Sequence, residues 1–205
     1  MIKLPKFPEV KKELLDSLAL VAEDKRAAEW ERQTNNVKAF KKIIKEEGLV
    51  IQDNRCAWCT LMLGRRGRRT AHRDHIAPKK QYPKWTFFPK NIIMSCEYCN
   101  GFTIKCDLDT VKELKDVYED CEFYIVHPYI DEVELHIGFS YDHPTHGVVI
   151  NGLSEKGLWT IEKMKLDDGY LTILRAQDYA YCKMIDSLPD YYATLLLDAT
   201  HKNLK

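Results

Sequence analysis

Residues 56–59, Cys-Ala-Trp-Cys, and residues 96–99, Cys-Glu-Tyr-Cys, contain four of the seven cysteines of the chain. They form two C-x2-C pairs, with 36 residues between Cys59 and Cys96. Two-residue spacing lets both sulfurs of a pair turn onto one ion, and two pairs supply four thiolates for a tetrahedral site with Zn–S distances of about 2.3 Å. We therefore expect a structural zinc ion bound by Cys56, Cys59, Cys96 and Cys99.

The alternative for these cysteines is a set of reduced thiols without a metal. Residues 49–107 have poor apolar periodicity, so a metal would supply folding energy, on the order of 10 kcal/mol, that the segment lacks. Four thiolates leave no open coordination position, so this zinc would hold structure and not catalyse. Cys106, Cys121 and Cys182 fall outside the pattern and are expected to be buried free thiols.

Length and composition exclude two classes of protein. The 205 residues suit one domain, or one core with appendages. A hydrophobic content of 45% with 30% charged residues is unlike that of a membrane-spanning or a disordered chain. The N-terminal residues contain no apolar signal core, so we expect a cytoplasmic protein without membrane association.

The net charge of zero includes two segments of strong and opposite charge. Residues 64–90 contain nine basic residues and one acid, whereas residues 107–136 contain ten acids and two lysines. The basic segment is a candidate contact for a polyanion. The alternative is a solvated basic loop.

Apolar spacing predicts helices at both ends of the chain. Residues 9–47 are expected to be helical, with a break at 33–36 and a stop at Gly48. Thr110-Val-Lys-Glu113 resembles a capping box that opens a helix to about Tyr118. Strands are expected near 73–76, 91–94, 123–127, 134–139 and 148–151, followed by two or three helices from residue 158.

Between the cysteine pairs lies His72-Arg-Asp74-His75-Ile-Ala-Pro78. Adjacent residues of a strand point to opposite faces, so Asp74 can bind a divalent cation while His75 reaches a water molecule from another direction. His72 lies on the Asp74 face, either as a further metal ligand or as a hydrogen-bonding residue. Asn91 precedes the second cysteine pair, and Asn100 follows it directly.

Together these residues resemble the HNH endonuclease family in its zinc-bearing form. The signature of that family is an acid-His-Ile/Val-x-Pro strand, a middle Asn, and a last His or Asn after the second cysteine pair. The intervals match over about 50 residues, with Asn100 in place of the commoner His. The resemblance implies a ββα-metal core, with strands near 70–76 and 91–94 and a helix that starts near Cys96.

The resemblance also implies a role for each matching residue. Asp74 and Asn100 would bind one catalytic Mg²⁺ or Mn²⁺, for which oxygen ligands are suited. His75 would be the general base that takes a proton from the attacking water. Asn91 would hold the loop and orient His75.

On this basis we expect an α+β fold with three parts: a helical scaffold at 1–50, a nuclease core with zinc knuckles at 51–107, and a mixed strand and helix region at 108–205. The basic residues then become expected contacts to nucleic-acid phosphates, with DNA favoured and no base specificity. They are Arg65, Arg66, Arg68, Arg69, Arg73, Lys79, Lys80 and Lys105.

A looser resemblance covers more of the chain. Pro78-Lys79, Tyr82-Pro83, residues 95–102 and Val126-His-Pro-Tyr129 are similar to small HNH proteins of bacterial anti-phage systems, such as the nuclease subunit of Septu-type and retron-linked systems. That likeness implies a partner, an ATPase or a sensor subunit.

Three functions remain open at this stage. The chain is a metal-dependent endonuclease, a zinc-knuckle protein that binds nucleic acid without cutting it, or a zinc-stabilised module for protein interaction. The complete Asp-His, Asn and Asn set favours the first, because a binding module does not need it. The sequence does not decide between DNA and RNA, nor does it give the trigger, the partner or the oligomeric state.

Overall fold

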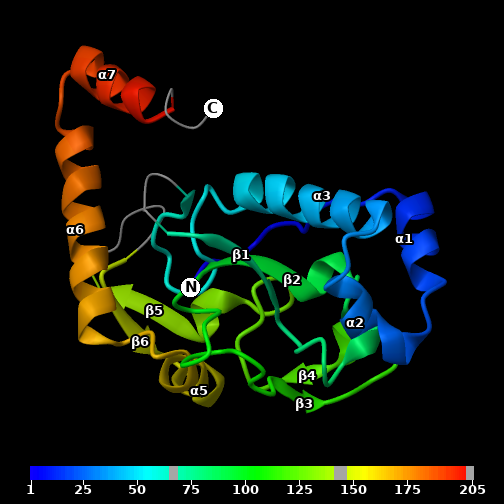
Figure 1. Cartoon of the computed structure of the whole chain (residues 1–205). Helices are drawn as coiled ribbons and strands as arrows, with labels where there is room; N and C mark the ends of the chain where they lie inside the picture. The colour runs from blue at the N-terminus through cyan, green and yellow to red at the C-terminus, as the bar shows by residue number, and fades with distance from the viewer. Residues whose placement is uncertain (65–68, 141–146, 202–205) are drawn as a thin grey trace.

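The structure, a computed structural model, describes residues 1–64, 69–140 and 147–201. Within these ranges the chain combines helices with three separate two-stranded antiparallel sheets (Figure 1). The prediction of a mixed α+β fold is therefore confirmed. None of the described helices is both long enough and apolar enough to cross a bilayer.

The N-terminal helices are α1 (Lys12–Ala19), α2 (Arg26–Trp30) and α3 (Asn35–Ile51). Helix α3 buries Val37, Phe40, Ile44 and Gly48 along one face. The expected stop at Gly48 is wrong, because this glycine is a point of close packing: a Cβ atom there would lie 3.0 Å from Met94 Cγ. The helix runs on to Ile51, along the sheet that carries the candidate site.

That sheet pairs β1 (Ala71–His75) with β2 (Ile92–Cys96), in the register Ala71↔Cys96 and His75↔Ile92. All five residues of β2 are buried. Helix α3 lies along one side of this hairpin (Figure 1). The two predicted strands are thus present, each displaced by one or two residues.

Two predicted helices are absent. Residues 97–107 form successive turns, so the helix expected near Cys96 is absent and the ββα core is not confirmed. Residues 111–113 are strand β3 (Val111–Glu113), which pairs with β4 (Glu122–Phe123). Instead of capping a helix, the Thr110 hydroxyl donates a hydrogen bond to the Ile76 carbonyl at 2.6 Å. This long-range contact outweighs the local capping signal.

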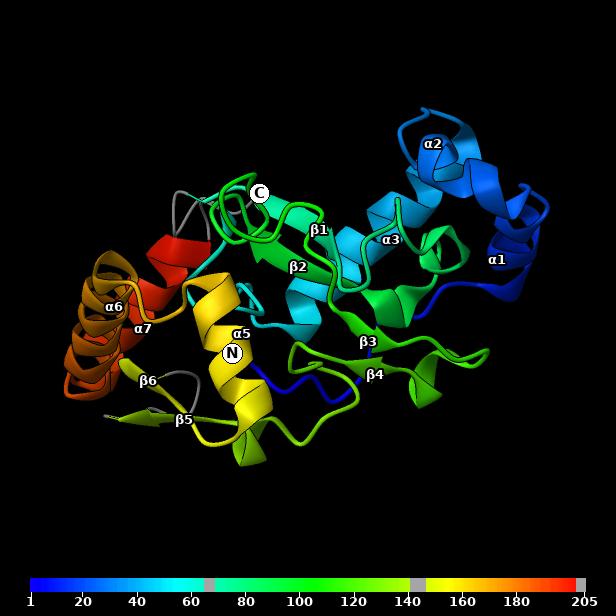
Figure 2. The same cartoon turned by 90° about the horizontal axis from the view of Figure 1, so that it is seen from below.

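The C-terminal part starts with the hairpin of β5 (Ile137–Ser140) and β6 (Val149–Gly152). Helices α5 (Glu155–Met164), α6 (Gly169–Asp186) and α7 (Asp190–His201) follow. The Ser154 hydroxyl and the Asp168 carboxylate accept backbone N–H groups at the starts of α5 and α6. Helix α6 flanks the body of the molecule, and α7 extends from its end (Figures 1 and 2).

The larger apolar core takes residues from all three predicted segments, for example Leu4, Trp58, Ile93, Val126 and Leu171. A second cluster joins the N-terminal helices to Phe87 and Ile92. The segment boundaries at 50 and 107 stay a prediction.

The packing around α5 predicts that alanine substitutions at two glycines change the free energy of unfolding by different amounts. A Cβ atom at Gly157 would lie 1.8 Å from the His136 carbonyl oxygen, whereas Gly169 at the start of α6 has no neighbour within 4 Å. Gly157→Ala should therefore lower the free energy of unfolding by roughly 3 kcal/mol, because backbone must move. Gly169→Ala should change it by less than about 1 kcal/mol, toward higher stability. Chemical denaturation measures both, and equal values would contradict the packing of α5.

Candidate metal centre and Asp74–His75 site

Four cysteines from two turns meet in the interior. Cys56 and Cys59 follow α3, Cys96 ends β2, and Cys99 lies in the next turn. Each is at most 1% exposed, and their sulfur atoms all lie within 4.8 Å of one another. The Cys59 and Cys96 sulfurs are 3.9 Å apart, close to the ~3.8 Å that tetrahedral zinc requires at Zn–S distances near 2.3 Å. The donor set fits a metal ion such as zinc, as the sequence predicts.

Electrostatics at the cluster favour a bound cation. Burial raises the pKa of the Cys56 thiol well above its usual range, and hydrogen bonds from the other cysteines lower the pKa of Cys96. Without a cation, some of these cysteines must therefore stay protonated, because several neighbouring thiolates repel one another strongly at low dielectric. Metal binding releases those protons, so metal affinity should fall as the pH falls.

Arg175 is a buried cation whose charge interacts with those of the cysteines, and the sequence analysis missed it. Its fully buried guanidinium on α6 donates to the carbonyls of Val148 and Leu166, at 2.7 and 2.9 Å. Burial lowers the pKa of Arg175, and the charges of Cys59 and Cys99 oppose that shift. Four thiolates around Zn²⁺ carry two net negative charges, so a buried cation beside them offsets part of that charge. No motif marks Arg175, because it comes from a helix 76 residues beyond Cys99.

Asp74 is only 1% exposed, and both of its carboxylate oxygens have partners. Oδ1 lies 2.9 Å from the Lys105 ammonium, and Oδ2 accepts the Trp58 indole N–H at 2.7 Å. Lys105 also donates to the His75 carbonyl at 2.5 Å. Lys105, which the sequence analysis counts among the phosphate contacts, is thus buried and committed to Asp74 in this structure.

His75 lies on the opposite face of β1 and is 7% exposed. Its Nε2 is 2.9 Å from the Thr86 carbonyl oxygen, and its ring meets the Trp30 ring edge-on at 4.5 Å between centroids. A carbonyl only accepts, so Nε2 carries the proton and Nδ1 the lone pair. Burial lowers the pKa of His75 to about 3, which keeps the imidazole neutral at physiological pH.

Asn91 fastens the loop that follows His75. Its side-chain oxygen accepts the Ala77 N–H at 2.7 Å and the Tyr118 hydroxyl at 2.8 Å. Its amide donates to the carbonyls of Ala77 and Trp85, at 3.0 and 3.1 Å. These bonds hold the positions around His75, and the orienting role that the resemblance implies for Asn91 stays a prediction.

Asn100 and His72 lie together, with Asn100 Nδ2 3.4 Å from His72 Nδ1. His72 shares a strand face with Asp74, so the predicted metal ligands lie on one side of β1. Across the described ranges, however, the only group of three or more His, Cys, Asp or Glu side chains arranged to hold a metal is the four-cysteine cluster. Both Asp74 oxygens are occupied, so these residues as arranged do not fit a divalent cation.

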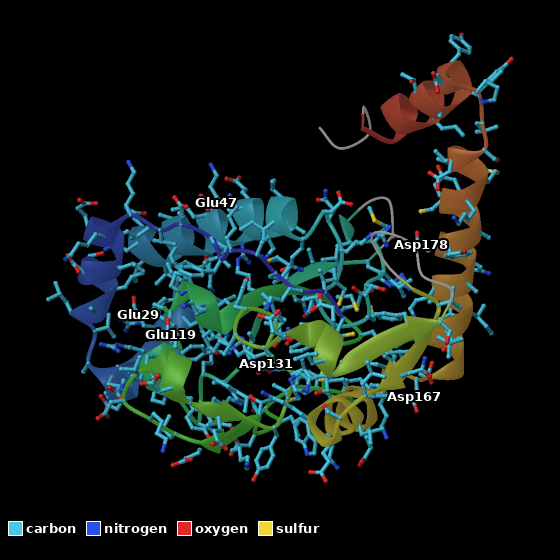
Figure 3. The ribbon with its side chains drawn as sticks, turned by 180° about the vertical axis from the view of Figure 1, so that it is seen from behind. Glu29, Glu47, Glu119, Asp131, Asp167 and Asp178 are labelled. Atoms are coloured by element: carbon cyan, nitrogen blue, oxygen red, sulfur yellow. The ribbon has the colours of Figure 1, made fainter. Side chains whose placement is uncertain are left out.

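Three lysines of the basic segment pair with acids of this same chain. Lys79 contacts Glu31 at 3.3 Å, Lys80 contacts Asp107 at 2.7 Å, and Lys90 contacts Glu119 at 2.5 Å. Figure 3 labels Glu119 at the edge of the body. Arg69 pairs with Gly64 through backbone hydrogen bonds, and Arg73 Nε donates to the Lys41 carbonyl at 2.6 Å. Arg65, Arg66 and Arg68 lie outside the described residues.

Comparison with known proteins adds no assignment. Neither the family models nor the curated proteins searched gave a match to this chain.

Loss of one thiolate should remove both the metal and stability. Cys96→Ser should abolish the retention of about one zinc per chain and strongly lower the melting temperature, because the metal contributes folding energy. Cys106→Ser is the matched control, since this half-buried cysteine lies outside the cluster. Elemental analysis and thermal unfolding measure both. Unchanged metal content in Cys96→Ser would contradict a four-thiolate site.

Removal of Lys105 should be costly because it leaves a buried carboxylate unpaired. Lys105→Met should lower the free energy of unfolding by about 3–5 kcal/mol. The double variant Asp74→Asn/Lys105→Met should recover much of that loss, because it leaves no buried charge and the amide oxygen still accepts from Trp58. Urea denaturation of all three variants measures the coupling, and additive effects would contradict the ion pair.

Proposed function

We propose that this chain is an endonuclease of the HNH type that hydrolyses nucleic-acid phosphodiester bonds, with zinc as its structural metal. One observation carries the proposal. Asp74 and His75 end β1 on opposite faces, the loop beyond them is fastened by Asn91, and the four-cysteine cluster anchors the far end of the same hairpin. Bound at that cluster, zinc stabilises the hairpin and takes no part in the chemistry.

His75 has the protonation state that a general base needs. Its neutral imidazole has Nδ1 free to accept a proton, since Nε2–H is held by the Thr86 carbonyl. The Trp30 ring covers the imidazole in this structure. Access of a water molecule and a phosphate to His75 therefore requires Trp30 to move.

The charge at Asp74 is balanced internally. Lys105 lies where a cation bound to Asp74 Oδ1 would be, so we assign no catalytic step to Mg²⁺ or Mn²⁺. In this arrangement the ammonium of Lys105 and the indole of Trp58 hold the carboxylate in place next to the base in the sequence.

The second candidate is a zinc-stabilised protein that binds nucleic acid without cutting it. The observation in its favour is that Asp74 and His75 are both buried and both have internal partners. For the first candidate, the looser resemblance to anti-phage nucleases supports DNA as substrate and an ATPase or sensor subunit as partner.

Cleavage by matched histidine variants tests the proposal. Wild-type protein should cut at least one of duplex DNA, single-stranded DNA or RNA, and His75→Ala should cut at least ~10²-fold more slowly. His136→Ala, purified identically, should keep wild-type activity, because His136 contacts Ser154 near α5. Circular dichroism and zinc content should be unchanged in His75→Ala. Equal cleavage by wild type and His75→Ala would contradict the assignment, and a wild type that binds but never cuts would favour the second candidate.

Parallel assays with EDTA, Mg²⁺ or Mn²⁺ decide the metal requirement. Thermal stability gives a second test, which does not depend on cleavage activity. If Asp74 binds a divalent cation once Lys105 is removed, Mn²⁺ should raise the melting temperature of Lys105→Met. It should not raise the melting temperature of Asp74→Asn/Lys105→Met.

A further inference from the structure

A pocket of about 380 Å³ opens between α3 and β1, in the region that the sequence analysis treats as scaffold. It is lined chiefly by Lys38, Lys41, Lys42, Lys45 and Glu46 of α3 and by Arg73 of β1. In Figure 1, α3 runs along the β1–β2 hairpin, which brings these residues together from segments about 30 residues apart.

The four lysines follow the helical repeat. Their intervals of three, one and three residues place all four on one face of α3, a different face from that of the buried Val37, Phe40 and Ile44. Between Lys38 and Lys45 the helix rises about 10 Å. Over that length one strand of duplex DNA presents roughly three phosphates.

The charge of this pocket is not balanced within the described part of the chain. Five cationic side chains face the single carboxylate of Glu46, and that carboxylate contacts Lys42 only at 4.0 Å. Among the described residues, neither Lys38 nor Lys45 has an ion-pair partner. Lys80 and Lys90 of the basic segment, by contrast, are already paired with Asp107 and Glu119.

Two of the five cations are fixed at the base of the pocket. Arg73 Nε bonds the Lys41 carbonyl, while Lys41 Nζ donates to the Trp30 carbonyl and lies 4.7 Å over the Trp30 ring. Burial lowers the pKa of both groups; at Lys41 the charge of Glu31 opposes the lowering, whereas the charges of Arg73 and Lys79 add to it. An anion placed here would relieve this crowding of like charges.

We infer that the pocket between α3 and β1 binds phosphate groups of a nucleic-acid backbone. This inference rests on the proposed function and names where its substrate is held. Position favours nucleic acid over an acidic protein: Arg73 and His75 share a face of β1, and Trp30 contacts both Lys41 and His75. A phosphate chain in the pocket therefore lies beside the proposed general base. Lysine contacts to phosphates carry no base information, so binding is independent of sequence.

The test neutralises the three solvent-exposed lysines and leaves the fixed cations intact. Lys38→Gln/Lys42→Gln/Lys45→Gln should bind fluorescent duplex DNA at least tenfold more weakly than wild type at low salt, in EDTA so that cleavage does not interfere. The slope of log affinity against log salt concentration should become less steep by roughly 2–3, because each lost lysine–phosphate contact reduces the slope by about 0.9. Glutamine and lysine have similar helix propensities, so α3 should persist.

The matched control is Lys163→Gln/Lys165→Gln/Lys183→Gln, which removes the same charge from α5, α6 and the residue after α5. It should leave the slope unchanged. An equal loss in both triple variants would overturn the inference, because only net charge would matter. Failure of the wild type to bind nucleic acid would also overturn it, and would leave an acidic protein as the occupant.

Binding and cleavage separate this inference from the proposed function. If the wild type cuts nucleic acid and the α3 variant keeps its salt slope, the pocket assignment fails and the nuclease assignment stands. If the α3 variant loses binding and the wild type never cuts, the pocket assignment stands and the nuclease assignment fails.

Discussion

Four cysteine sulfurs that meet in the interior join the two halves of the candidate site. One pair follows α3 and the other begins at the end of β2, so a metal held between them ties the N-terminal helices to the β1–β2 hairpin. Trp58 lies inside the first pair, and the same turn that aims Cys56 and Cys59 at the metal aims the Trp58 indole at Asp74. The cluster thus positions one of the two groups that hold the Asp74 carboxylate.

The other group, Lys105, depends on the turns after the second cysteine pair. The Lys105 N–H donates to the Cys99 carbonyl at 3.3 Å, so the chain returns to the hairpin directly after the cluster. Cys106 has a φ of 41°, a conformation that a helix does not contain. This return path explains why the expected helix is absent and why a lysine meets Asp74. Because Asp74 carries a single negative charge, Lys105 and a divalent cation are competitors for it.

The sequence predicts the parts of this structure that depend on local chemistry. The C-x2-C spacing predicts the four-cysteine cluster, and the short runs at 73–76 and 91–94 predict the hairpin to within two residues. The errors come from contacts over long distances in the chain. Thr110 satisfies the Ile76 carbonyl and does not cap a helix, Gly48 packs on Met94, and the charge of Arg175 on α6 interacts with Cys59 and Cys99. No local pattern contains these partners.

The pairing of charged side chains also depends on contacts that are distant in the sequence, and it affects where a polyanion can bind. By composition alone, residues 64–90 are the candidate contact for a polyanion, and the segment that forms α3 is scaffold. In the fold, Lys79, Lys80 and Lys90 meet acids of this chain. Lys38 and Lys45 find no ion-pair partner among the described residues. A polyanion that bound residues 79–90 would have to displace carboxylates, whereas one that bound α3 would displace only water and counterions. Counterion release favours the second site, and that site reaches His75 through Lys41 and Trp30.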